Sequence, residues 1–166
     1  MRVSVQEADF DVGAETEALA AGRPEVGAVA SFVGYVRADK LAGESAADQA
    51  VSAMTLEHYP GMTEKSLEAI VAEAESRWSL LGVRVIHRFG RLVPGDRIVF
   101  VGVAGSHRGE AFAACEFIMD YLKTRAPFWK KEDTPAGGRW VDAREADDSA
   151  AARWAAACWR RPSAPG

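Results

Sequence analysis

The sequence predicts an α+β fold, a single domain in which a mixed or antiparallel sheet packs against helices. Its 166 residues are 48% hydrophobic and 27% charged, a composition typical of one globular domain that can bury a core without disulfides or metals. Strand and helix patterns interleave, but 83–90 and 97–105 are consecutive strand patterns joined by a turn at Pro94-Gly95-Asp96. Strands joined in this way favour antiparallel or mixed pairing.

The first quarter of the chain predicts a strand, a helix and a second strand. Residues 2–6 alternate weakly and predict a strand, and residues 11–22 predict a helix that ends at Gly22. The valine-rich and aromatic segment 26–36 predicts a buried strand. The small and charged residues of 38–49 lack periodicity and predict a mobile surface loop.

The middle of the chain adds strands and a helix. Residues 52–59 alternate and predict a strand, after which Thr63 is expected to cap a helix. The apolar residues at helical spacing on this helix are Leu67, Ile70, Val71, Ala74 and Trp78. The near-continuous apolar run 97–105 predicts a strand that is buried on both faces.

The most informative helix begins near Ser106, the expected N-cap, and Pro127 prevents it from running on. Its predicted buried stripe consists of Phe112, Cys115, Ile118, Met119 and Leu122. A short strand is expected at 139–141 and an alanine-rich helix at 147–159. We expect one domain over 1–154 and a C-terminal tail over 155–166, of which 160–166 is frayed.

Charge and composition exclude several classes of protein. The formal net charge is −4, so general affinity for nucleic acid is not expected. No basic leader precedes an apolar run, and no window approaches the roughly 18 apolar residues of a membrane span. Cys115 and Cys158 show no CxxC or metal-type spacing, and we expect Cys115 to be a buried thiol. These features predict a cytoplasmic protein without a metal or other cofactor.

Cationic residues gather around the helix that follows Ser106. His107 and Arg108 stand at its start, where backbone N–H groups and the macrodipole already favour an anion. A basic segment, expected to be a loop, follows the helix and contains no acid between Lys123 and Lys131. An acidic protein that concentrates cations locally often binds an anion there. The alternative is an exposed pair with ordinary salt-bridge partners.

Lys123 and Lys130 flank Pro127-Phe128-Trp129. A partly covered lysine can transfer protons or act as a nucleophile, whereas a solvated lysine at a helix C-terminus simply complements the dipole. The second interpretation fits Lys131 better. Phe128 and Trp129 either form the walls of a channel or pack in the core.

Arg37 follows the strand 26–36, and its guanidinium can donate two parallel hydrogen bonds to a phosphate. Gly34, within the strand, permits close approach of a ligand or of another backbone. The alternative is a bulge followed by a surface arginine. His58 and His87 lie within strand patterns without a third metal ligand at a recognisable spacing, which favours structural roles. The chain contains no P-loop, GxGxxG, HExxH or GxSxG motif.

Five motifs resemble the large, catalytic subunit of molybdopterin synthase, the MoaE family. They are FVGYVR at 32–37, LEHYPGMTEKSLEAI at 56–70, VIHRFGRLVPGD at 85–96, IVFVGVAGSHR at 98–108 and FIMDYLKTRAPFWKKE at 117–132. The resemblance runs from about Val26 to Trp154. It implies an α/β hammerhead-type fold and a sulfurtransferase that converts cyclic pyranopterin monophosphate to molybdopterin in molybdenum cofactor biosynthesis.

The resemblance also implies partners and site residues. Sulfur arrives as a thiocarboxylate on the C-terminal Gly-Gly tail of a small ubiquitin-like subunit, and two large and two small subunits form a heterotetramer around a large-subunit dimer. The residues implied for substrate binding or chemistry are Tyr35, Val36, Arg37, His107, Arg108, Lys123, Lys130, Lys131 and Glu132. Tyr35 stands where family members often carry a lysine, which puts a charge contact there in doubt.

Within this set we expect Lys123 and Lys130 to be catalytic. Lys123 is expected to polarise the thiocarboxylate or its acyl intermediate, and Lys130 to contact the pterin or donate a proton. Lys123 and His107 are 16 positions apart on one predicted helix, or roughly 24 Å along its axis. One pocket that contains both must therefore be built across a dimer.

Two other functions remain as alternatives. A dimeric scaffold would bind the ubiquitin-like partner without transferring sulfur, although the presence of both lysines argues against it. A phosphohydrolase acting on a phosphorylated heterocycle would be expected to carry clustered Asp and His ligands, which the sequence does not show.

Overall fold

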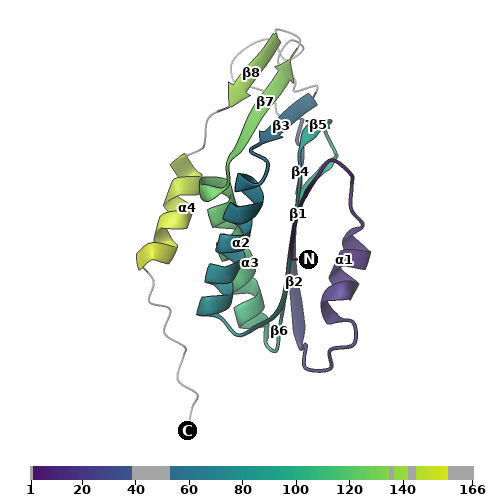
Figure 1. The fold of residues 1–166 in the computed structure, drawn as a ribbon, viewed down its shortest axis with the longest axis vertical. Helices are drawn as coiled ribbons and strands as arrows, with labels where there is room; N and C mark the ends of the chain where they lie inside the picture. Colours follow the sequence, from purple (N-terminus) through teal and green to yellow (C-terminus); the bar gives the residue numbers. More distant parts are fainter. Residues whose placement is uncertain (1, 39–52, 135–136, 142–144, 157–166) are drawn as a thin grey trace.

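The computed structural model describes residues 2–38, 53–134, 137–141 and 145–156, and it confirms the α+β class. Four described helices pack around two sheets, which we name sheet A and sheet B (Figure 1). Sheet A forms the body of the molecule together with three of the helices. Sheet B lies at one end of it.

Sheet A contains β1 (Val3–Gln6), β4 (Leu80–Arg88), β6 (Arg97–Gly105) and β2 (Ala28–Tyr35), in that spatial order. β1 pairs with β4 in parallel, and the other pairs are antiparallel. The turn between β5 and β6 contains Gly95 with φ +94°, a left-handed conformation that glycine adopts without strain. The predicted turn and the mixed sheet are therefore confirmed.

Helices cover both faces of sheet A. α2 (Met62–Arg77) and α3 (Arg108–Arg125) lie on one face and α1 (Val12–Ala20) on the other (Figure 1). Along β6, alternate residues enter the two cores: Val101 packs beneath α3 and Phe100 beneath α1. The predicted burial of this strand on both faces is confirmed, and each fully buried large apolar side chain contributes about 1.5–3 kcal/mol.

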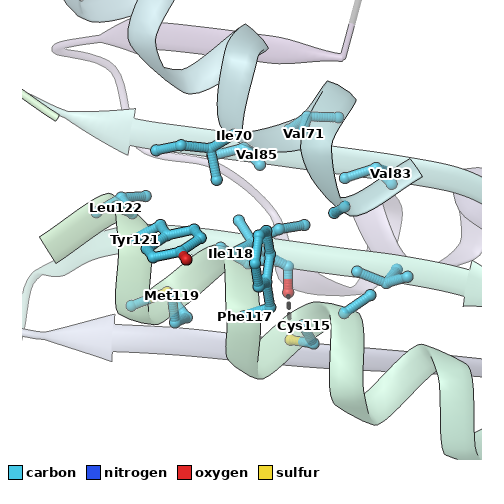
Figure 2. Close-up of a cluster of buried hydrophobic side chains, with 14 of the residues drawn as sticks. Ile70, Val71, Val83, Val85, Cys115, Phe117, Ile118, Met119, Tyr121 and Leu122 are labelled. Atoms are coloured by element: carbon cyan, nitrogen blue, oxygen red, sulfur yellow. Dashed lines mark hydrogen bonds between the residues drawn. The ribbon is translucent and has the colours of Figure 1, made fainter. Parts of the chain in front are cut away.

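The larger core contains the predicted apolar face of α2 and most of the predicted face of α3. Figure 2 shows the side chains of both helices meeting those of sheet A. Cys115 is buried among them, and its thiol donates to the carbonyl oxygen of Val101 at 3.7 Å (Figure 2). The prediction of a buried thiol is confirmed.

Sheet B is antiparallel and contains β5 (Gly90–Leu92), β3 (Ala53–His58), β7 (Phe128–Thr134) and β8 (Gly137–Val141), in that order. Only Phe89 separates β4 from β5, so one stretch of chain passes from sheet A to sheet B. The last helix, α4 (Glu145–Ala156), packs on α3, where the indole N–H of Trp154 donates to Asp120 at 2.6 Å.

The prediction of a basic loop after α3 is wrong. Lys123 and Arg125 lie in the last turn of α3, and Lys130 and Lys131 lie on β7. The loop prediction rested on charge, but β7 forms because aromatic residues favour strands and β3 supplies a partner along its length.

Three details of the helices also differ from the predictions. The N-cap of α3 is His107 rather than Ser106, and the N-cap of α2 is Gly61 rather than Thr63. Gly61 has φ +80°, and its N–H donates to the carboxylate of Glu64 at 2.7 Å. Phe112 is not buried but 65% exposed, because it lies beyond the face that α3 presents to the sheet.

Some predictions concern residues that are not described. The loop expected at 38–49 lies outside the described residues, apart from Ala38. The tail expected at 155–166 is described only for 155–156, at the end of α4. The proposed limit between domain and tail remains a prediction. The helix expected at 147–159 begins two residues earlier and is described to Ala156.

Candidate functional site

The residues predicted to form the site lie at two opposite ends of α3. β6 leads into α3 through Ser106 and His107 alone, so the helix turns back along the sheet and ends beside sheet B (Figure 1). Lys123 is in its last turn, whereas His107 and Arg108 are at its start. At 1.5 Å per residue the two ends are roughly 24 Å apart. One protomer therefore does not bring all the predicted residues together.

Lys123 lies beside a carboxylate that sequence reasoning did not identify. Its Nζ is 3.4 Å from Oδ1 of Asp147, on α4, and its side chain is 51% exposed. Coulomb attraction at such exposure is weak, because water screens it. The amine is therefore held near Asp147 but remains available to another anion. No sequence signal pointed to Asp147, because a separation of 24 residues matches no helical or strand spacing.

Lys130 and Glu132 form a pair on one face of β7. Residues two apart on a strand point to the same side, and Nζ of Lys130 is 3.0 Å from Oε1 of Glu132. Glu132 is buried, and the half-buried Lys130 compensates its charge. The paired residues of β3 are Met54 and Leu56, both in a small apolar core. The pair thus combines a partly covered amine with a fixed carboxylate, an arrangement that can hold and transfer a proton.

Lys131 points to the opposite side of β7 from Lys130, as strand alternation requires. Its Nζ lies 5.9 Å from the ring centroid of Trp140, on β8. Trp129, on the same side, is exposed and lies 6.4 Å from the ring of Tyr59. Phe128 instead packs against the larger core. Of the two aromatics considered as channel walls, only Trp129 is on the surface.

Tyr35, Val36 and Arg37 lie at the end of β2 that is nearer to sheet B. Val36 is buried in the small core with Met54, and its N–H donates to the carbonyl oxygen of Asp96 at 2.9 Å. Tyr35 and Arg37 are exposed. A register shift interrupts the pairing between Gly34 and Tyr35, so the strand does end in a bulge followed by a surface arginine. Arg37 therefore lies at the same end of the molecule as Lys123.

Gly34 provides close packing within sheet A. A Cβ at this position would lie 2.7 Å from Cγ1 of Val99 on β6, closer than atoms of packed side chains approach. The glycine accommodates the neighbouring strand, which was one of the two roles considered for it.

His107 and Arg108 are both exposed at the N-terminus of α3. The His107 side chain makes no capping hydrogen bond. Among the described residues, neither side chain has an ion-pair partner, so the salt-bridge interpretation has no support there. The cationic Arg108 at the positive end of a helix dipole is favourable only if an anion or a partner surface compensates its charge.

The two strand histidines stabilise the region where sheets A and B meet. His87 is buried and stacks on Phe128 with ring centroids 3.7 Å apart. The ring of His58 contacts that of Phe89 in a tilted arrangement, with centroids 4.3 Å apart, and its Nε2 lies 4.0 Å from Oε1 of Glu64. Burial lowers the pKa of His87 to about 4, so the ring is neutral at physiological pH.

Within the described part of the chain, no helix is both long and apolar enough to cross a membrane.

Over most of its length, the chain is similar to proteins of one family. The sequence model of the family described as MoaE protein matches residues 5–125. The molybdopterin synthase catalytic subunit of Ralstonia nicotianae is 64% identical over 152 residues, which cover 92% of this chain and 83% of that protein. The protein of the same name from Pseudomonas aeruginosa is 58% identical, with 93% of this chain and 99% of the relative covered.

A solved structure shows the same fold. The molybdopterin biosynthesis MoaE protein from Burkholderia ambifaria superposes with a TM-score of 0.76 at 57% sequence identity, over 93% of this chain and 97% of that one. The family model includes Tyr35, Val36, Arg37, His107, Arg108 and Lys123 and ends before the strand that carries Lys130, Lys131 and Glu132.

Proposed function

The chain belongs to the MoaE family, and on that premise we propose that it is the catalytic subunit of a molybdopterin synthase. It converts cyclic pyranopterin monophosphate to molybdopterin by installing the two sulfurs of a dithiolene, a step of molybdenum cofactor biosynthesis that belongs in the cytoplasm. The observation that carries this proposal is the 64% identity to a catalytic subunit over 92% of the chain.

The sulfur comes from a second protein. Burial raises the pKa of the Cys115 thiol to about 11, so this sulfur stays protonated and enclosed and is a poor nucleophile. The name catalytic subunit, carried by the relatives, implies at least one further subunit. We assign that role to a small ubiquitin-like protein whose C-terminal Gly-Gly thiocarboxylate supplies sulfur.

The two lysines at the sheet B end perform the chemistry. The thiocarboxylate sulfur attacks a substrate carbon and displaces an oxygen substituent, forming a C–S bond. Water then hydrolyses the resulting thioester, which leaves the sulfur on the pterin and returns the small subunit as a carboxylate. Lys123, at the exposed end of α3, polarises the thiocarboxylate or the acyl intermediate, exchanging Asp147 for this anion. Lys130, held by Glu132, contacts the pterin or supplies a proton.

The substrate phosphate is bound by arginine. Arg37 is exposed at the sheet B end, and its guanidinium can hold two phosphate oxygens at once. Replacing Arg37 with alanine is expected to raise the apparent KM for the pterin about tenfold or more while changing kcat less. An unchanged KM for the pterin would count against the phosphate role.

The active site is shared between two copies of the chain. His107 and Arg108 are too far from Lys123 within one protomer to reach the same small substrate. Supplied by the neighbouring protomer of a homodimer, they complete the cationic site: Arg108 assists with the phosphate, and His107 assists binding or proton transfer. The homodimer forms the centre of a heterotetramer with two sulfur-carrier subunits.

A reconstituted assay tests the function. The purified chain is mixed with the thiocarboxylated small subunit and cyclic pyranopterin monophosphate, and dithiolene formation is measured. Product formation is expected only when all three are present. Binding of the small subunit without product would favour a scaffold, and phosphate release without sulfur transfer would favour a phosphohydrolase.

A further inference from the structure

A short junction separates the two lysines to which catalysis is assigned. α3 ends at Arg125 and β7 begins at Phe128, so residues 126–128, which we name the α3–β7 junction, connect the helix of Lys123 to the strand of Lys130. The position of one amine relative to the other therefore depends on the backbone path through this junction.

A hydroxyl group from α2 holds the junction. Thr63 is fully buried, and its hydroxyl donates to the carbonyl oxygen of Pro127 at 3.2 Å. The same hydroxyl oxygen accepts the backbone N–H of Tyr59 at 3.0 Å. Thr63 thus connects the loop before α2 to the junction. A buried hydroxyl is costly unless it is hydrogen-bonded, and both of these bonds compensate that cost.

An aromatic stack from sheet A provides the second contact. The imidazole of His87 lies against the ring of Phe128, with the two planes within 20° of each other. Its Nδ1 is 2.8 Å from the carbonyl oxygen of Arg88, which requires a proton on that nitrogen and fixes the orientation of the ring. Phe128 also pairs with His58 through the backbone of β3, so the start of β7 is held by both sheets.

We propose that Thr63 and His87 are positioning residues for sulfur transfer, because together they fix the α3–β7 junction and thereby the placement of Lys130 relative to Lys123. The proposal rests on the function assigned above to the two lysines. Neither residue touches the substrate. Their effect on the reaction is indirect, and it is separable from their effect on stability.

The first experiment deletes the hydroxyl group. Thr63→Val preserves volume but removes both hydrogen bonds, and kcat is expected to fall about tenfold to a hundredfold, since small misplacement of catalytic groups has effects of this size. The KM for the thiocarboxylated subunit should change little, and Thr63→Ser should restore most of kcat.

Thr16→Val is the matched control. Thr16 on α1 also donates its hydroxyl to a backbone carbonyl, that of Val12 at 2.7 Å, but it lies on the other face of sheet A. This control should lose less stability than Thr63→Val, because its hydrogen bond is half-buried and lies within one helix turn, and it should not lose kcat. Amide hydrogen exchange across 126–130 should be faster in Thr63→Val than in Thr16→Val, and equal exchange in the two variants would overturn the proposal.

The second experiment changes the stack. His87→Phe keeps an aromatic ring against Phe128 and should retain most of kcat, whereas His87→Ala should lose at least about tenfold. If His87→Ala does not fold, the positioning role is tested with the Thr63 variants alone. Wild-type kcat in folded Thr63→Val overturns the positioning role and leaves the proposed function intact. A wild-type chain that forms no dithiolene overturns the proposed function, and the positioning role with it.

Discussion

Lys123 and Lys130 differ in how firmly their neighbours hold them. Lys130 is half-buried beside the buried Glu132 at 3.0 Å, whereas Lys123 is more exposed and 3.4 Å from Asp147. The looser contact leaves Lys123 able to exchange its carboxylate for that of an incoming partner, and the tighter one keeps Lys130 in place.

Lys123→Ala is expected to lower the rate of dithiolene formation by about 10²–10⁴-fold, the usual contribution of a positioned charge or proton donor. The fold and the binding of the small subunit should persist, because the side chain is 51% exposed. Rates from the reconstituted assay and calorimetric affinity for the small subunit check both statements. Lys65→Ala, an exposed change on α2, is the control. Near-normal turnover in Lys123→Ala would remove this residue from the mechanism.

His87 makes the stability of the protein depend on pH. Burial, together with the nearby charge of His58, lowers its pKa from 6.5 to about 4. Below pH 6.5 the unfolded chain binds a proton that the folded chain does not accept until about pH 4. The free energy of unfolding therefore falls as pH decreases through this range, by up to about 3 kcal/mol.

His87→Phe should remove this contribution while keeping the stack on Phe128. Urea unfolding of both proteins at pH 7 and pH 4.5 measures the difference. The variant is expected to lose less stability than the wild type between the two values. Parallel losses would show that His87 does not titrate as its burial implies.

At the scale of elements, apolar periodicity predicted the strands and helices most reliably. β6 occupies 97–105, as predicted, because an uninterrupted apolar run between a tight turn and a helix leaves few other structures. β7 could not be predicted in this way, since its lysines conceal the alternation and its partner β3 is 70 to 80 residues away in sequence. Phe112 is a residue for which helical spacing was misleading. Its spacing predicted burial on the apolar face of α3, but the side chain is exposed, because the elements packed on the helix determine how much of its surface is covered.

The close approach of β2 to the start of α3 depends on one glycine. A Cβ at Gly27 would lie 2.2 Å from the carbonyl oxygen of Ser106, a backbone atom that cannot move without shifting His107 and the helix. Gly27→Ala is therefore expected to lower the free energy of unfolding by about 1–3 kcal/mol or more.

Gly109 offers the matched comparison. It lies in the first turn of α3, and a Cβ there would meet nothing within 4 Å, so Gly109→Ala should be neutral or stabilise the protein by up to about 1 kcal/mol. Urea unfolding of the two variants measures the contrast. Equal stabilities would mean that the segments of Gly27 and Ser106 move apart at little cost in free energy.

At the scale of the whole molecule, the proposed mechanism needs two chains for one active site, because His107 and Arg108 lie at the opposite end of α3 from Lys123. The residues themselves could be predicted from the sequence, as could their separation along α3. Asp147 could not be predicted, because it reaches Lys123 only through the packing of α4 on α3.

Mixing two inactive variants tests the shared site. In a dimer of Lys123→Ala with Arg108→Ala, one of the two sites has both changes and the other has neither. Random exchange of protomers should therefore restore about a quarter of the wild-type sites. The rate of the mixture, compared with that of each variant alone, measures this recovery. A mixture as inactive as its components would place both residues in the same protomer's site.

The spatial order of sheet A has a consequence for synthesis of the chain. β1 and β2 are the first strands to be made, yet among the described strands they occupy opposite edges, where β1 pairs with β4 and β2 with β6. The amino-terminal third thus leaves the ribosome with its valine-rich strand lacking a hydrogen-bonding neighbour, and the sheet can close only after Gly105 has emerged. Such delayed, non-local pairing slows folding and exposes nascent chains to aggregation, so production of this enzyme should benefit from chaperones or a low growth temperature.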